Sequence, residues 1–373
     1  MKKLIALGLS ISMLLFLLAG CVKMLPAEPY EKGGDLAAAD TGVESEPEVK
    51  DVTDVLGRTV SIPLDVERVV VTFNIEEYLA VGGEGAADKL VGFSHGYWEG
   101  RREDAWEAFT EALPQLREIE DVGYNDTISP ETIISLTPDV VIMSSPVNYS
   151  YIEPYLELME ESGIKVVFVD YHSQTLEMHT ASNMVIGEVM NREERAAEIS
   201  EFYSRQMAQV TDRIATLNQD DHGPRVYMEF SRGADNFGNT WSEKMWGAMI
   251  RTCGGENIAA GMEGNSVEIA PEKIIAADPE VIIFAASPQT DIDSNIVLGY
   301  GADGGLAAER LSLYMNREGW AGLTAVKDGR MGALYHDLSR HIFDFAGAQF
   351  MAKMIHPELF ADLEPEENLA EFF

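Results

Sequence analysis

The sequence predicts an α/β fold of two similar lobes, each with a central, mostly parallel sheet, joined by one long α-helix. Three observations predict it: a helix–strand unit that occurs twice, an arginine-led strand that opens each half, and one long amphipathic helix between the halves. Two such lobes leave a cleft between them, so we expect a ligand to bind there.

The repeated unit is a helix that leads into a buried strand. Residues 128–145 read ISPETIISLTPDVVIMSS and residues 269–286 read IAPEKIIAADPEVIIFAA, with eight of eighteen positions identical. Each copy has Pro at the first helical position, an apolar stripe at helical spacing, a second Pro that stops the helix, and an all-apolar strand. One repeat at so wide a spacing predicts two lobes rather than a solenoid, which needs several short repeats.

Each half also opens with an arginine followed by an apolar strand, at Arg68 and at Arg225. A helix follows and is predicted to end at a glycine pair, Gly82–Gly83 or Gly254–Gly255, because glycine suits the left-handed residue past a helix end. The stretch from this pair to the repeated unit is longer in the first half and is rich in aromatic residues.

The helix between the halves has the strongest helical period in the chain. Apolar residues recur at spacings of three and four from Ala196 to Leu217, with charged residues on the opposite face. A helix over 192–217 would be roughly 39 Å long. We therefore place an N-terminal lobe at 51–190, the interdomain helix at 191–219 and a C-terminal lobe at 220–373.

The N-terminal end predicts export and a lipid anchor. Residues 1–20 have a basic start and an apolar run, which is typical of a secretory signal. Leu18 to Cys21 looks like a bacterial lipobox, so Cys21 is expected to be lipidated and to hold the protein on the outer face of the cytoplasmic membrane. Residues 21–50 have the composition of a flexible tether. Cys253 is then unpaired, and we interpret it as a small buried apolar residue.

The formal net charge is −36, from 63 acidic and 27 basic residues. Because no basic stripe is available to neutralise phosphates, nucleic-acid binding is excluded. The acidity does not identify a ligand.

Several short motifs together resemble the iron-siderophore and cobalamin class of ABC-transporter substrate-binding proteins. The resemblance begins at Asp54, Gly57, Arg58, Val60, Ile62 and Pro63 and continues through Glu67 to Val70, both Pro-Glu helices and the long helix. It ends with residues 325–330 (AVKDGR) and with Ala352, Lys353, His356, Pro357, Glu358 and Phe360.

The resemblance implies a ligand in the cleft, small hinge closure and docking onto a permease dimer with its ATPase subunits. In this class an acidic residue on each lobe contacts permease arginines, and the matching segments place these residues at Glu131 and Glu272. Each also lies in the predicted first turn of a helix, where a carboxylate complements the helix dipole whatever its other role.

Residues just after the predicted strands are the candidates for ligand contact, because ligands of open α/β sheets bind beyond the carboxyl ends of strands. Arginine could pair with ligand carboxylates or catecholates, and a neutral His or a Tyr could bind iron directly. No spacing supports a bare-metal site. The candidates are Asn74, His95, Tyr97, Trp98, Ser145, Tyr149, Tyr171, His172, Arg232, Asn236, Trp241, Gln289, His336 and Arg340.

The predicted function is capture of an iron chelate for an ABC importer, without a cofactor and without enzymatic activity. A corrinoid or haem is the alternative ligand in the same role, and a sensor that does not transport is the alternative role. Residues 92–96 (GFSHG) also match the G-x-S-x-G nucleophile elbow, which leaves a serine esterase using Ser94 as a remote alternative. The lack of an immediate strong helix after the motif argues against it.

Overall fold

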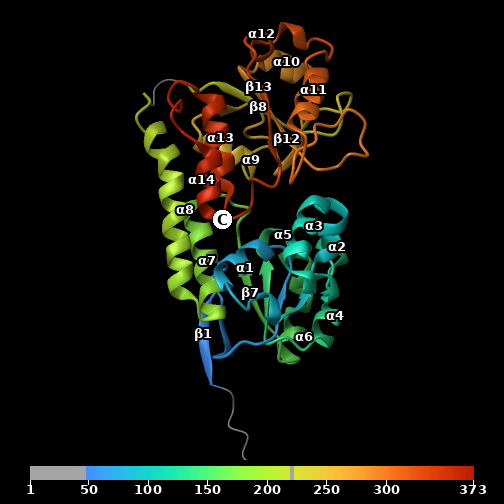
Figure 1. Cartoon of the computed structure of the whole chain (residues 1–373), viewed down its shortest axis with the longest axis vertical. Coiled ribbons are helices and arrows are strands. Elements are labelled where there is room, and N and C mark those ends of the chain that lie inside the picture. The colour runs from blue at the N-terminus through green and yellow to red at the C-terminus, as the bar shows by residue number, and fades with distance from the viewer. Residues whose placement is uncertain (1–47, 219–221) are drawn as a thin grey trace, which may run out of the picture. The chain divides into compact units, whose positions relative to one another are not determined.

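Two separate parallel sheets form the framework of the protein (Figure 1). The computed structural model describes residues 48–218 and 222–373. The predicted signal segment, Cys21 and nearly all of the tether therefore lie outside the described residues. The first described element is an antiparallel pair, β1 (Val49–Thr53) with β2 (Thr59–Pro63), and β1 begins two residues before the predicted lobe boundary.

Four strands follow the same order in the two sheets, which confirms the repeat, and β5 is an extra strand at one edge of the N-terminal sheet. The N-terminal sheet runs β5 (Glu120–Asp121), β4 (Leu90–Phe93), β3 (Val69–Val71), β6 (Val140–Ser144), β7 (Lys165–Val169). The C-terminal sheet runs β10 (Glu256–Asn257), β8 (Arg225–Phe230), β12 (Val281–Ala286), β13 (Met331–Tyr335). In both, the strand of the repeated unit pairs in parallel with the arginine-led strand on one side. A short antiparallel pair, β9 (Asn239–Trp241) with β11 (Ser266–Glu268), is added in the C-terminal half.

Both sheets are covered on both faces, which explains their all-apolar strands. In β6, Val140 and Ile142 belong to one apolar cluster, whereas Val141 and Met143 belong to the cluster on the other face. The strand β12 alternates in the same way between two clusters of the C-terminal half.

The covering helices of the N-terminal half surround its sheet. They are α1 (Ile75–Gly82), α2 (His95–Arg101), α3 (Glu103–Ala112), α4 (Pro130–Ser135), α5 (Ser145–Ile152), α6 (Leu156–Glu161) and α7 (Leu176–Met190). The single-turn 3₁₀ helices of this half are η1 (Ala87–Lys89), η2 (Pro114–Glu118), η3 (Asn125–Thr127) and η4 (Glu153–Tyr155). The predicted helix end is confirmed, since Gly83 has φ 69°.

Helices also cover the sheet of the C-terminal half. They are α9 (Trp246–Thr252), α10 (Pro271–Ala277), α11 (Gly304–Tyr314), η5 (Trp320–Gly322), α12 (Thr324–Lys327), α13 (Asp344–Ile355) and α14 (Pro365–Phe372). Gly254 past α9 has φ 71°, as predicted. Cys253 is fully buried and its thiol donates to the carbonyl of Ala348, and burial raises the pKa of that thiol.

The predicted long helix is α8 (Glu193–Ile214), shorter by a few residues than 192–217 because residues 215–217 form a turn. Its first half adds Ala196 and Tyr203 to the N-terminal core, and Val210 belongs to the C-terminal core. In Figure 1 it runs beside α7 and α13, with which it is in contact. The helix therefore ties the two halves together through burial as well as through the backbone.

A second connection was not predicted. Ile342, Phe343, Phe345 and Ala346, at the start of α13, are buried in the apolar cluster of the N-terminal half. The C-terminal half thus completes the core of the N-terminal half.

Candidate ligand-binding site

A pocket of about 250 Å³ lies between the two halves, at the carboxyl ends of β8, β12 and β13 and beside α2. This is the position that an open α/β sheet predicts for a ligand. The lining residues are Tyr97, Arg101, Arg102, Phe230, Arg232, Asn239, Thr240, Trp241, Met245, Ser266, Ser287, Gln289, His336 and Asp337.

Five of the sequence candidates line this pocket, namely Tyr97, Arg232, Trp241, Gln289 and His336. Arg340 lies directly behind the wall, where its guanidinium donates to Asp337 Oδ1 over 3.0 Å. The hydroxyl of Ser287 is buried at the pocket and has no hydrogen-bond partner among the described residues, so it is available to a ligand.

Aromatic rings around Phe73 form the deep wall beside the pocket. Tyr97 stacks on Tyr124 with 4.2 Å between ring centroids, and both rings contact Phe73. Arg340 places its guanidinium carbon 5.4 Å from the centre of the Phe73 ring, and His172 packs on the same ring at 5.1 Å. Burial, followed by the charge of Arg340, holds the pKa of His172 well below its ordinary value, so this imidazole is neutral.

His336 presents a hydrogen-bond donor rather than a metal ligand. Burial and the charge of Arg340 lower its pKa to about 3, so the ring is neutral at physiological pH. Its Nδ1 accepts a hydrogen bond from Trp246 Nε1 over 3.0 Å, which places the single ring proton on Nε2. The ring is therefore oriented to donate to a ligand oxygen, and direct coordination of iron by His336 is disfavoured.

Two arginines that line the pocket have no acidic partner for their positive charge. Of the arginines that the structure describes, Arg101 and Arg232 alone have side chains without a hydrogen bond or ion pair. Arg101 ends α2 in the N-terminal half, and Arg232 follows β8 in the C-terminal half, where its guanidinium lies over the Phe230 ring. Each half thus contributes one free positive charge to the pocket.

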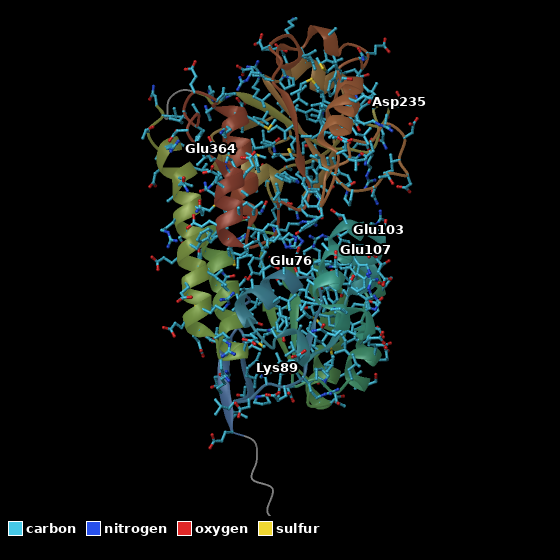
Figure 2. The ribbon with its side chains drawn as sticks, viewed as in Figure 1. Glu76, Lys89, Glu103, Glu107, Asp235 and Glu364 are labelled. Carbon is cyan, nitrogen blue, oxygen red and sulfur yellow. The ribbon has the colours of Figure 1, made fainter. Side chains whose placement is uncertain are left out.

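Arg102, the third arginine of the pocket lining, and Arg340 behind it are neutralised within a buried network that joins the halves. Arg102 Nε donates to Asp337 Oδ2 over 2.8 Å, and the two terminal nitrogens of Arg102 donate to both oxygens of Glu76, at 2.7 and 3.1 Å. A parallel contact joins Asp104 to the hydroxyl of Tyr335 and the backbone amide of Tyr300. Figure 2 shows Glu76 at the junction of the two halves.

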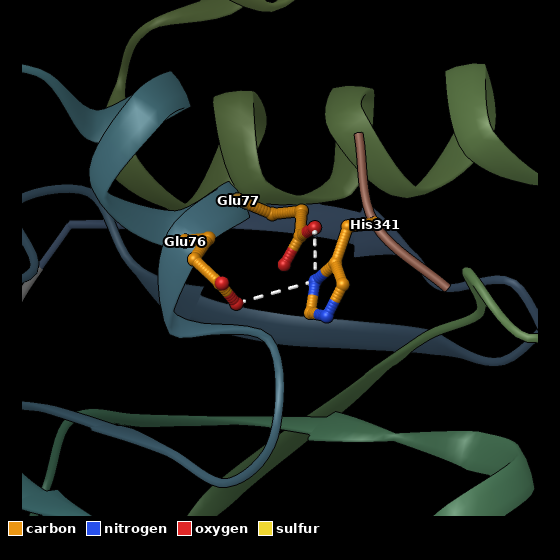
Figure 3. Close-up of side chains that lie close together, drawn as sticks. All are labelled: Glu76, Glu77 and His341. Carbon is orange, nitrogen blue, oxygen red and sulfur yellow. Dashed lines mark hydrogen bonds and ion pairs between the residues drawn. The ribbon is translucent and has the colours of Figure 1, made fainter. Parts of the chain in front are cut away.

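Glu76, Glu77 and His341 lie close enough to suggest a metal site (Figure 3). His341 Nδ1 is 3.2 Å from Glu76 Oε2 and 3.1 Å from Glu77 Oε1, and all three side chains are buried. However, Arg102 occupies both oxygens of Glu76, and Glu77 accepts from the amide of Ile342 and from Asn74. Because these donors satisfy the carboxylates, we interpret the cluster as an ion-pair network rather than a metal centre.

Several sequence candidates are not at the pocket, because position after a strand does not fix the direction of a side chain. Trp98 and Tyr171 are buried in the N-terminal core, and Asn74 is buried against Glu77. Tyr149 packs on Phe168 and donates to Glu153, whereas His95 stacks on Trp106 and pairs with Glu99. Asn236 is exposed, and Ser145 begins α5; neither lines the pocket.

The main residues that the sequence did not predict are Arg101, Arg102 and Asp337. The two arginines lie a helix turn or more beyond β4, whereas the prediction considered only residues directly after strands. The sequence signal that could have identified them is that two arginines are adjacent in a strongly acidic chain.

The esterase alternative lacks the required geometry. Ser94 is buried and its hydroxyl donates to the carbonyl of Gly123 rather than to an imidazole. One argument from sequence was wrong, since a helix, α2, does begin within the motif, at His95. The hydrogen bond of Ser94, not the lack of a helix, disfavours a nucleophile here.

A second hollow of about 620 Å³ lies beside α1, α3, α8 and the C-terminal residues. It is lined chiefly by apolar side chains such as Phe109, Phe202 and Phe343. The smaller pocket combines convergent polar groups with aromatic walls, so we assign the ligand to that pocket.

Glu131 and Glu272 occupy equivalent positions, in the first turns of α4 and α10, and both are exposed. No helix of the described residues is long and apolar enough to cross a membrane.

Residues 69–336 match the family model for periplasmic binding proteins. The chain belongs to the periplasmic binding protein family. A solved structure of the same fold, the TroA-like periplasmic binding protein FepB from Veillonella parvula, is 31% identical with a TM-score of 0.79, over 86% of this chain and 94% of that one. The family and the two-lobed fold predicted from sequence are thereby confirmed.

More distant similarities extend the comparison. The vitamin B12-binding protein of Salmonella typhimurium is 24% identical over 181 residues, which are 48% of this chain and 63% of that protein. The match therefore spans less than two thirds of the curated relative. A periplasmic heme-binding protein from Pseudomonas aeruginosa shares the fold, with 19% identity, a TM-score of 0.55 and coverage of 79% of this chain and 94% of that one.

Proposed function

We propose that this protein is the extracytoplasmic binding component of an ABC importer and that its ligand is an anionic iron chelate. Membership of the periplasmic binding protein family supports the role. The proposal also places the protein on the outer face of the cytoplasmic membrane, held by a lipid on Cys21, with a permease dimer and its ATPase subunits as partners.

The observation that carries the ligand class is the pair of uncompensated arginines. A chain with a net charge of −36 has enough carboxylates to pair its exposed cations, yet Arg101 and Arg232 are left free at the pocket. Guanidinium groups bind carboxylate and catecholate oxygens through charge-assisted hydrogen bonds. The Nε2 proton of His336 adds a neutral donor, and Trp241 and Tyr97 supply apolar contact for a chelate's rings.

A corrinoid in the same role is the second candidate, supported by the similarity to a vitamin B12-binding protein. The free arginines favour the chelate, since guanidinium groups form their strongest hydrogen bonds with negatively charged oxygens.

The test is titration of the purified protein with a ferric tris-catecholate, haemin and cyanocobalamin, followed by quenching of tryptophan fluorescence, which Trp241 at the pocket should report. We expect the ferric chelate to bind. Substituting Arg101→Gln or Arg232→Gln should weaken its binding by about tenfold to a hundredfold, the range for one charge-assisted hydrogen bond.

The matched control is Arg205→Gln on α8, an exposed arginine that pairs with Glu201 far from the pocket lining. It should leave the affinity unchanged. Binding of cyanocobalamin alone would transfer the proposal to a corrinoid, and the absence of binding by all three ligands would refute the ligand class.

A further inference from the structure

Asp337 is the one carboxylate among the residues that line the pocket. It lies just after β13 and is 4% exposed. Its Oδ2 accepts from Arg102 Nε over 2.8 Å, and its Oδ1 accepts from Arg340 over 3.0 Å. Asp337 therefore bridges two buried arginines, one from each half.

Because of this bridge, the positive charges of Arg102 and Arg340 are offset within the protein and do not act on a ligand. The two terminal nitrogens of Arg102 also bind Glu76, so Arg102, Arg340, Asp337 and Glu76 form a connected set of two cations and two anions, which His341 borders at 3.2 Å from Glu76. Burial alone would raise the pKa of Asp337, but Arg102 and Arg340 hold it well below its ordinary value. The carboxylate therefore stays ionised across the physiological range.

None of the remaining titratable groups adds a charge to the pocket lining. His336 is neutral, and Glu77 lies behind the wall, where its Oε1 is 3.1 Å from His341 Nδ1. Asp104 accepts from Tyr300 and Tyr335 and does not line the pocket. What the ligand meets are the two free guanidinium groups of Arg101 and Arg232.

We propose that Asp337 determines ligand specificity by charge: it neutralises Arg102 and Arg340, so that the pocket offers two positive charges and selects chelates that carry two negative charges. The inference rests on the proposed function and specifies its ligand further. A third negative charge on the ligand would find no free guanidinium group in the pocket to pair with, so it would add no favourable contact. A chelate with fewer negative charges would leave one of the arginines unpaired.

The experiment uses hexadentate ferric chelates in which catecholate arms are replaced one by one with hydroxamate arms. Because each catecholate carries one more negative charge than a hydroxamate, the series carries three, two, one and no net negative charges at nearly constant size. For the wild-type protein we expect the affinity to be highest for the chelate with two charges.

In Asp337→Asn the uncompensated positive charge at the pocket rises by one, because the carboxylate that offsets the arginines is lost. The preference should move to the chelate with three charges, with a change of about tenfold or more in the ratio of the two affinities, as for one charge-assisted contact. The matched control is Asp104→Asn, which removes the same charge and another contact between the halves without freeing an arginine. It should keep the wild-type preference.

The outcomes separate this inference from the proposed function. If the wild-type protein binds none of the four chelates, the proposed function fails. If it binds them but Asp337→Asn keeps the wild-type ratio, or Asp104→Asn shifts it equally, the role of Asp337 is refuted. Should Asp337→Asn not fold, the wild-type series still decides, since an affinity that rises steadily up to three charges contradicts the inference.

Discussion

At the scale of single residues, several buried charged groups are paired with an opposite charge from the other half, as Arg102 is with Asp337. His179 on α7 shows it clearly. Its Nε2 lies 2.9 Å from Asp344 Oδ2 at the start of α13, its Nδ1 lies 3.0 Å from the carbonyl of Thr175, and its ring stacks on Tyr203. Both ring nitrogens face acceptors, which favours the protonated ring.

This geometry predicts a pH-dependent stability. Burial would lower the pKa of His179, but the charge and hydrogen bond of Asp344 raise it above the ordinary value. The stabilisation is therefore complete below the pKa of histidine in an unfolded chain, about 6.5, and is lost as the pH rises through the higher value of the folded protein. Melting temperatures of the wild type and of His179→Gln, measured between pH 5 and 9, should differ most at low pH and converge at high pH.

The control is His222, a histidine for which the structure gives no ion pair. His222→Gln should have the same pH profile as the wild type. A difference between wild type and His179→Gln that stays constant with pH would show that packing, and not the ion pair, accounts for the effect.

At the scale of elements, sequence predicted the repeated units well because their signals are local. The Pro that begins α4 and α10, the apolar period and the parallel strand that follows all act within eighteen residues. The two helices still differ in capping: Ser129 accepts from the amide of Thr132, whereas Ala270 offers no side-chain cap. The direction of Trp98 or Tyr149 depends on packing against other elements, which no local pattern encodes.

Glu131 and Glu272 lie in the first turns of α4 and α10, and reversing their charges tests whether they contact a permease. Both carboxylates are exposed at equivalent positions of the two halves and are outside the pocket. If they contact permease arginines, Glu131→Lys combined with Glu272→Lys should reduce uptake of the ligand by about a hundredfold, while affinity for the ligand stays unchanged. Cell uptake and fluorescence titration measure the two quantities separately.

The matched control is Glu157→Lys with Glu367→Lys, which makes the same charge change at exposed positions of α6 and α14. Uptake should persist in this control. Loss of uptake in both double variants would point to net charge instead of docking.

At the scale of the whole molecule, sequence predicted two lobes and one connecting helix but not how far the halves depend on each other. The pocket needs both halves, since Arg102 and Asp337 come from opposite sides of the junction. Such a contact joins residues 235 positions apart, so neither partner carries a local sign of the other. The sequence therefore located the cleft and about a third of its lining, but not the charge network that shapes it.

The same dependence predicts that the N-terminal half does not fold alone. Its core includes Ile342, Phe343, Phe345 and Ala346, all nearly or fully buried. A fragment of residues 48–218 would lose these side chains and expose the apolar surface that they cover, and burying a Phe or Ile contributes roughly 2 kcal/mol each. We expect the fragment to show no cooperative thermal transition, whereas residues 48–373 should unfold in a single one. Calorimetry of the fragment and of the longer chain measures both, and a fragment that melts as cooperatively as the longer chain would mean that the N-terminal core is complete without α13.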